Sequence, residues 1–262
     1  MAATQVKAAG HLKEGKGHGP ARLNLGGVGA QSVLVTLTAL RSWRAADRWV
    51  TGRVLDVGCG SQPYRLLFKG RYEEWVGVDV APSSLPGFPL DVRGDAQVLP
   101  FGEGTFDTVV AAEVLEHLPR PELFWNEAKR VLRPGGHILL STPFLYWIHE
   151  KPNDYHRFTA YGLRAAAARA GFEVVRIEPR GGLFTVAADL ACKATVGAFG
   201  LLDRIWRNVV GGRRGNARSL RDGWTGRVLL AWPQIVLAYL LKYERVMSDT
   251  VTSGYMLVVR KV

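Results

Sequence analysis

Cysteine is scarce in this sequence, and its two copies, Cys59 and Cys192, stand far apart. A single pair cannot build the disulfide framework of a small secreted protein, and the Cys-x-x-Cys spacing of metal sites is absent. The first 20 residues also lack the continuous apolar core of a secretory signal. These absences favour a reducing, cytoplasmic compartment.

Acidic residues are also in short supply, because 23 Asp and Glu face 34 Lys and Arg, for a formal net charge of +11. The excess lies at the two ends: residues 1–50 hold seven basic and two acidic side chains, and residues 181–262 hold 12 and five. Residues 51–180 hold 15 and 16 and are close to neutral. A neutral core between basic ends indicates that the ends meet an acidic partner, such as nucleic acid, a membrane or a phosphorylated substrate.

The apolar pattern alternates between the period of a helix and the short runs of buried strands. Helices are predicted at 31–50, 63–70, 121–132 and 159–170, and strands at 53–57, 75–80, 106–112, 137–142, 172–178 and 254–262. This alternation predicts an α/β fold in which a mostly parallel sheet carries helices on both faces.

The same pattern divides the chain into four parts. Residues 1–28 are rich in Gly, Ala and Lys without an apolar period, and we expect them to be mobile. Residues 29–180 form the core with its leading helix, and residues 181–250 are a helical excursion. Residues 251–262 return to the core as its final strand.

The sharpest local motif is Val-Leu-Asp-Val-Gly-Cys-Gly at residues 54–60. Its glycines let the backbone turn tightly after a buried strand and approach a ligand closely. A dinucleotide fingerprint would have a third glycine where Pro63 stands, which disfavours a pyrophosphate at this turn. Asp79 ends the second strand, where a carboxylate can accept both hydroxyls of a ribose.

Several segments in register resemble the class I S-adenosylmethionine-dependent methyltransferases, in particular the broad type 11 group. The matching segments are VLDVGCG (54–60), VGVDV (76–80), GDAQVLPF (94–101), FDTVVAAEVLEHL (106–118), RVLRPGGHILLSTP (130–143) and AGFEVV (170–175). The resemblance implies a Rossmann-like sheet of seven strands that ends in an antiparallel hairpin. It also implies S-adenosylmethionine as cofactor and S-adenosylhomocysteine as product.

The resemblance assigns a set of residues to the cofactor site: Asp56, Gly58, Cys59, Gly60, Asp79, Val80, Asp95, Ala96 and Glu113. It implies that Asp56 lies near the ammonium of the methionine part and that Asp79 takes the ribose hydroxyls. It also implies that Asp95 accepts a hydrogen bond from the exocyclic amine of adenine. Glu113 would border both the methionine part and the acceptor.

An oxygen or ammonium nucleophile loses a proton when it is methylated, which favours a base near the acceptor. The candidates are His117, just past the fourth strand, and His149, Asp154 and His156, in the loop after the fifth. A purely structural interpretation of this loop pairs Asp154 with Arg157. A metal site built from the loop's own His, Glu and Asp residues is not expected, because scattered ligands on one loop are usually coincidence.

The excursion contains an apolar run, 228–241, in which 12 of 14 residues are hydrophobic, short of the roughly 20 that span a bilayer. A buried cap over the substrate pocket, an interfacial membrane helix and a nucleic-acid surface are the three interpretations. The apolar run disfavours nucleic acid. We therefore expect a pocket cap or peripheral contact with the inner face of a membrane through residues 204–242.

The sequence thus predicts a methyltransferase that acts on a small-molecule, glycan or lipid-linked acceptor. An RNA-directed methyltransferase and a methyltransferase-fold protein that binds without turnover are the alternatives. The intact glycine turn and Asp79 argue against the second of these.

Overall fold

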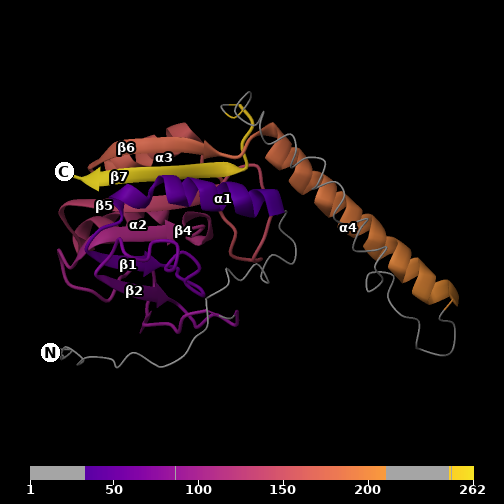
Figure 1. Ribbon diagram of the computed structural model, residues 1–262, viewed down its shortest axis with the longest axis horizontal. Coiled ribbons are helices and arrows are strands. Elements are labelled where there is room, and N and C mark those ends of the chain that lie inside the picture. Colours follow the sequence, from indigo (N-terminus) through magenta and orange to yellow (C-terminus); the bar gives the residue numbers. More distant parts are fainter. Residues whose placement is uncertain (1–32, 86, 211–247, 249) are drawn as a thin grey trace.

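The computed structural model describes residues 33–85, 87–210, 248 and 250–262 of the chain. Its centre is one seven-stranded sheet with the strand order β3-β2-β1-β4-β5-β7-β6 (Figure 1). The strands are β1 (Arg53–Val57), β2 (Glu74–Asp79), β3 (Val92–Arg93), β4 (Phe106–Ala112), β5 (Leu132–Pro143), β6 (Phe172–Arg180) and β7 (Gly254–Lys261).

Strand direction divides the sheet into two parts. Strands β1 to β5 pair in parallel, whereas β7 runs antiparallel to both of its neighbours, β5 and β6. The mostly parallel, seven-stranded α/β sheet with a closing antiparallel hairpin is therefore confirmed. Because β1, β2, β4 and β5 are parallel, their carboxyl ends meet at one edge, where such sheets bind ligands.

Helices cover both faces of the sheet. The covering helices are α1 (Val33–Ala45), α2 (Pro121–Val131) and α3 (Ala160–Arg169), with short 3₁₀ turns η2 (Asp47–Trp49) and η3 (Leu115–His117), and a fourth helix, α4, spans Leu183–Val210. Trp43 of α1 packs in one buried cluster with Leu139 of β5, while Phe124 of α2 and Leu163 of α3 pack in another with Ile138. Successive residues of β5 thus face opposite layers, as a strand buried on both faces requires.

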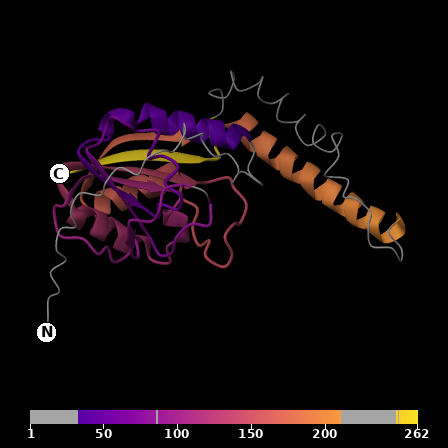
Figure 2. The ribbon, with the colours of Figure 1, turned by 60° about the horizontal axis from the view of Figure 1, so that its bottom comes forward.

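The helix α4 leaves the sheet and projects away from it in both views (Figures 1 and 2). It accounts for the first part of the predicted helical excursion. Among the described residues, no helix combines the length and the apolar character needed to cross a membrane. The predicted mobile segment 1–28 and the apolar run 228–241 lie outside the described residues.

Most predicted elements occur within a few residues of their expected bounds. The α3 helix begins where its capping residue predicts, since the Thr159 hydroxyl accepts a hydrogen bond from the Gly162 amide at 3.0 Å. The two-residue strand β3 was not predicted, because a segment this short carries no period. Strand β5 begins five residues earlier than the predicted residue 137, directly after α2.

The helix predicted at 63–70 is wrong. Residues in this segment form successive turns, in which amides such as Arg65 and Lys69 bond to carbonyls three residues back. A helix of this length gains few internal hydrogen bonds. Contacts with α1 fix the segment instead, since Tyr64 and Phe68 pack on Trp43 with ring centroids 4.6 and 6.2 Å apart.

Candidate functional site

The turn after β1 lies at the carboxyl edge of the sheet and requires glycine at two positions. Gly58 and Gly60 have φ angles of 61° and 49°, in the left-handed region that side chains disfavour. A Cβ at Gly58 would lie 2.6 Å from a methyl group of Val114, whereas one at Gly60 would meet nothing within 4 Å. The turn is therefore packed against Val114 at Gly58, whereas the space beside Gly60 is open.

Asp79, at the end of β2, is bonded to this turn. One carboxylate oxygen accepts from the Gly60 amide at 2.9 Å, and the other accepts from the Val80 amide at 2.7 Å. The two amides fix the orientation of the carboxylate, and each of its oxygens retains a lone pair. A half-buried, oriented carboxylate beside an open glycine turn can accept hydrogen bonds from a diol.

Asp56 and Cys59 are buried beneath the turn. Asp56 accepts a hydrogen bond from the Trp75 indole at 3.3 Å, and burial, with the nearby charge of Asp79, raises its pKa to about 8. Burial likewise raises the pKa of the Cys59 thiol to about 12, so this cysteine remains a neutral packing group. A cation bound near Asp56 would favour its charged form.

The segment after β3 extends the same edge. Asp95 is exposed, and one of its carboxylate oxygens accepts from the Gln97 amide at 2.8 Å, while Ala96 is buried beside it. Val80 is exposed as well. The Gly94 amide donates to the Asp79 carbonyl at 2.9 Å, so Asp95 and Ala96 follow directly beyond Asp79 along this edge.

Glu113, directly after β4, is held by two residues that the sequence analysis missed. The Arg180 guanidinium at the end of β6 donates to its two oxygens at 2.5 and 3.0 Å, and the Ser141 hydroxyl donates at 2.6 Å. Burial alone would raise the pKa of Glu113, but the charge of Arg180 and these hydrogen bonds lower it. Glu113 has a φ of 57°, a conformation uncommon for a residue other than glycine.

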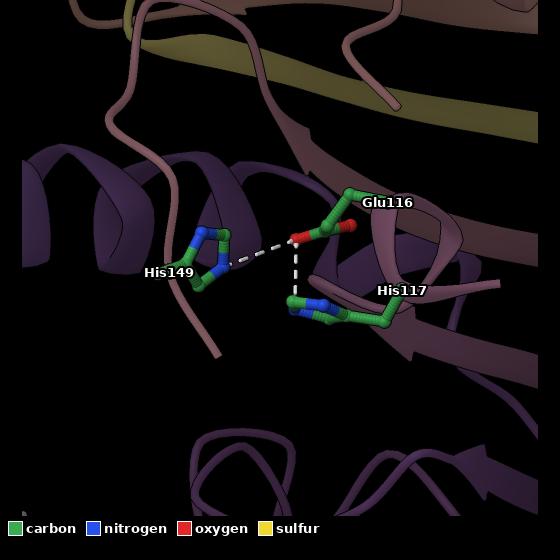
Figure 3. A group of neighbouring side chains, drawn as sticks. All are labelled: Glu116, His117 and His149. Atoms are coloured by element: carbon green, nitrogen blue, oxygen red, sulfur yellow. Dashed lines mark ion pairs between the residues drawn. The ribbon is translucent and has the colours of Figure 1, made fainter. Parts of the chain in front are cut away.

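A second group lies beside Glu113 and comes from η3 and the loop after β5. Figure 3 shows the rings of His117 and His149 directed toward one carboxylate oxygen of Glu116. The Nε2 atoms lie 3.7 Å (His117) and 4.0 Å (His149) from this oxygen. The Glu116 side chain is fully buried, and burial, with the charge of Glu113, raises its pKa well above the usual range.

Asp154 supports this group from the loop. It accepts from the Arg157 guanidinium at 2.5 and 2.7 Å, and these bonds hold the pKa of its carboxyl well below its usual range. It also accepts from the His149 amide at 2.9 Å and lies 3.2 Å from the His149 Nδ1 atom. The predicted pairing of Asp154 with Arg157 is confirmed.

The four predicted catalytic residues thus take different places. His117 and His149 meet, with ring centroids 4.8 Å apart, and Asp154 lies behind His149. His156 packs its ring on Phe158, with a centroid distance of 5.5 Å, and is outside this group. Glu116 was not predicted, although it stands next to His117 in the sequence, because its burial depends on the loop that covers it.

Comparison with known proteins gives these two groups a family context. Residues 55–140 match the profile of a family described as a methyltransferase domain. A protein of Mycobacterium sp. (strain KMS) named as an uncharacterized methyltransferase is 36% identical over 134 residues, which cover 47% of this chain and 52% of that protein. The chain therefore spans about half the length of this relative.

A longer match is the 2-methyl-6-phytyl-1,4-hydroquinone methyltransferase of Synechocystis sp., 29% identical over 222 residues, or 73% of this chain and 68% of that protein. Two solved structures show the fold. The [4+2]-cyclase SpnF has a TM-score of 0.52 at 21% identity and covers 87% of this chain and 80% of its own. A SAM-dependent methyltransferase from Archaeoglobus fulgidus has a TM-score of 0.50 at 17% identity, over 87% of this chain and 94% of its own.

Proposed function

Because this chain belongs to the class I S-adenosylmethionine-dependent methyltransferases of the type 11 group, we propose that it methylates a small amphiphilic or lipid-linked acceptor. The observation that carries the proposal is the Asp79 carboxylate, oriented by the Gly60 and Val80 amides at the open side of the glycine turn. SpnF, which shares the fold, is a cyclase, so the fold alone does not determine the reaction.

The residues at the carboxyl edge fit the parts of S-adenosylmethionine in chain order. Asp79 accepts the ribose hydroxyls, Asp95 and Ala96 meet adenine, and the open space at Gly60 leaves room for the backbone to approach the ligand. Asp56 is buried within reach of the charge of a cation at the turn, and Glu113 borders the methionine part. When bound, S-adenosylmethionine supplies a methyl group on a sulfonium centre that a nucleophile can displace.

The protein contributes alignment, a dry site and handling of the acceptor's proton. The ion pair with Arg180 holds the Glu113 side chain in place, between the proposed cofactor part and the proposed acceptor part of the edge. On the acceptor side stand Glu116, His117 and His149, whose nitrogen and oxygen atoms can bind or deprotonate a hydroxyl. His156, outside this group, shapes the loop.

The acceptor class is inferred from α4. Leu190, Leu201 and Leu202 on this helix are 63%, 60% and 53% exposed. The ammonium of Lys193, also on α4, contacts the ring of Trp147, in the loop that carries His149. The helix therefore joins an apolar surface to the acceptor side, which suits an acceptor with a long apolar part. The substrate in the name of the Synechocystis relative, a phytyl hydroquinone, has that character.

We also retain the proposal of peripheral membrane contact through residues 204–242, most of which lie outside the described residues. The basic residues of this stretch would meet anionic headgroups, and its apolar residues would enter the interface. A lipid-linked acceptor would then reach the site from the membrane surface.

Two measurements test the proposal. Calorimetry should detect saturable binding of S-adenosylmethionine to the wild type, and Asp79→Ala should weaken it at least tenfold, because both ribose hydrogen bonds to a charged acceptor are lost. Asp47→Ala, which removes a carboxylate paired with Arg71 away from the site, is the matched control and should leave the affinity unchanged.

Release of S-adenosylhomocysteine is then measured with a panel of hydroquinone, prenylated, glycan and RNA acceptors. Turnover with amphiphilic acceptors is the expected result. Absence of cofactor binding in the wild type would sink the proposal. Binding without turnover on any acceptor would favour the non-catalytic alternative, and turnover confined to RNA would favour an RNA-directed enzyme.

A further inference from the structure

Three potential metal ligands converge at the acceptor side of the sheet edge. The Nε2 atoms of His117 and His149 and a carboxylate oxygen of Glu116 all lie within 4.8 Å of one another. The nitrogens lie 3.7 and 4.0 Å from the Glu116 oxygen, which is longer than a hydrogen bond (Figure 3). The three atoms therefore surround a gap and do not bond to one another.

Within the part of the chain that the structure describes, the Glu116 carboxylate lies at ion-pair distance from the two imidazoles but makes no hydrogen bond. Both of its oxygens are buried and neither makes a hydrogen bond. Burying a carboxylate without a hydrogen bond is costly, so such groups are normally hydrogen-bonded or coordinate a metal. The two imidazole Nε2 atoms lie 3.7 and 4.0 Å from one of its oxygens, across the gap.

The other ring nitrogen of each histidine determines which atom faces the gap. His117 Nδ1 lies 2.6 Å from the Asn153 carbonyl, which can only accept, so Nδ1 carries the proton. His149 Nδ1 lies 3.2 Å from the ionised Asp154 carboxylate and 3.4 Å from the Trp147 carbonyl, which again can only accept. In the neutral rings, both Nε2 atoms thus direct a lone pair toward Glu116.

This is the arrangement of metal-binding histidines, which donate their second N–H to a carboxylate or a backbone carbonyl. We propose that Glu116, His117 and His149 bind a divalent transition-metal ion of the zinc class. Two imidazoles and one carboxylate suit Zn²⁺, Fe²⁺ or Co²⁺ and disfavour Ca²⁺ and Mg²⁺, which prefer oxygen ligands. Each of the three ligand atoms would move about half an ångström toward their common centre to form metal–ligand bonds of about 2.0–2.2 Å.

A metal site built only from the loop after β5 was not expected from the sequence. The site proposed here is different, because among its three ligands only His149 belongs to that loop. His117 and Glu116 come from η3, after β4. Glu150 lies 3.8 Å from His117 Nε2 and is exposed, so it is available as a fourth ligand. Three protein ligands with a further position open to solvent or substrate are typical of catalytic zinc sites.

A catalytic role for this ion rests on the proposed methyl transfer, whereas the binding of the ion to the three ligands does not. At this position, a metal ion would bind an acceptor hydroxyl and lower its pKa. The histidines would then act on the acceptor as ligands of the ion, and Asp154 would be a positioning residue for His149.

The test uses the full chain without a histidine tag, stripped of metal by a chelator. Titration with Co²⁺, followed by its visible ligand-field absorption, should saturate at one ion per chain, and Zn²⁺ should displace it. His117→Ala, His149→Gln and Glu116→Gln should each weaken Co²⁺ binding at least tenfold. Asp154→Asn should weaken it about 10- to 100-fold, as expected for loss of a carboxylate that orients a ligand.

His137→Gln is the control, because His137 stands on β5, pairs with Arg260 of β7 and is not in the group. It should bind Co²⁺ like the wild type. Thermal unfolding of each metal-free variant establishes that it is folded, and added Zn²⁺ should raise the melting temperature of the wild type and of His137→Gln more than that of the other variants. Absence of saturable Co²⁺ absorption in the wild type, or an equal loss in His137→Gln, would overturn the proposal.

Calorimetry with S-adenosylmethionine on the metal-free chain separates the two proposals. Cofactor binding without Co²⁺ binding removes the metal site and leaves the proposed function intact. Co²⁺ binding without cofactor binding supports the metal site and contradicts the proposed function.

Discussion

The Arg180 guanidinium and the Glu113 carboxylate form a two-pronged ion pair, at 2.5 and 3.0 Å, that joins the ends of β6 and β4. Arg180 is only 4% exposed, and its backbone carbonyl accepts from the hydroxyls of Thr252 and Ser253, just before β7. The pair thus connects the parallel part of the sheet to the antiparallel hairpin at the edge where the candidate site lies.

Glu113→Gln should destabilise the protein by about 3–5 kcal/mol, because it leaves the buried Arg180 cation without its counterion. Urea unfolding measures the loss. Glu173→Gln removes one partner of the exposed pair with Arg260 and should cost less than about 1 kcal/mol. Equal losses in the two variants would mean that the buried pair has no special role.

Substituting alanine for Gly58 and for Gly60 should separate the effect of the turn on stability from its effect on ligand binding. Gly58→Ala places a Cβ 2.6 Å from Val114 and should lower the melting temperature strongly. Gly60→Ala meets open space and should cost only about 1–2 kcal/mol for its left-handed backbone. Its Cβ would, however, occupy the space assigned to the cofactor, so calorimetry should show weaker S-adenosylmethionine binding. Unchanged affinity in a folded Gly60→Ala variant contradicts that assignment.

Stability should depend on pH through Asp56. Its folded-state pKa of about 8 lies above the unfolded value near 4, so the folded state holds a proton that the unfolded state releases between these values. The contribution is therefore fully present below about pH 4 and declines as the pH rises toward 8. Asp56→Asn removes it while keeping an acceptor for the Trp75 indole.

The measurement is urea unfolding of the wild type and Asp56→Asn at several values between pH 5 and 8. Stability of the wild type relative to the variant should fall with pH, by at most about 1.4 kcal/mol per pH unit. Taking the difference between the two proteins cancels the titration of other groups, such as Glu116. Parallel curves would show that Asp56 titrates normally.

The apolar surface of α4 should contribute to membrane contact. A Leu201→Ser and Leu202→Ser double variant should bind anionic phospholipid vesicles at least tenfold more weakly than the wild type, because each buried methylene contributes about 0.8 kcal/mol. Tyr161→Ser, at a residue that is 83% exposed on α3, is the control. Equal binding of all three proteins to the vesicles in a flotation assay would show that the apolar surface of α4 does not contribute to membrane contact.

The fold was predictable from the sequence because the strands of a parallel sheet are short apolar runs separated by helices. The 106–112 run appears as β4 with the same bounds, and Thr159 caps α3 as its residue type predicts. The glycine turn and Asp79 were predictable for a related reason, because a left-handed turn between a strand and the following segment depends on local sequence. Local rules were sufficient in these places.

The rest of the site depends on contacts between distant residues. Arg180 and Glu113 are 67 positions apart, and no local pattern indicates that a side chain at the end of β6 reaches the residue after β4 past the two strands between them. Glu116 is part of a recognised segment, but its burial follows from the loop around Tyr155, whose amide donates to the Glu116 carbonyl at 2.8 Å. The error at 63–70 has the same origin, since packing on Trp43 outweighs the preference of a short segment.

The hydrogen bond from the Arg180 amide to the Thr252 hydroxyl, at 3.1 Å, joins two positions that are 72 residues apart. The intervening segment therefore leaves the sheet and returns to it at nearly the same point. The entropy of closing such a loop grows only logarithmically, so doubling its length costs about 0.6 kcal/mol. Segments of different length and composition can therefore replace this one at little cost to the core, while the sheet edge that carries the glycine turn and Asp79 stays the same.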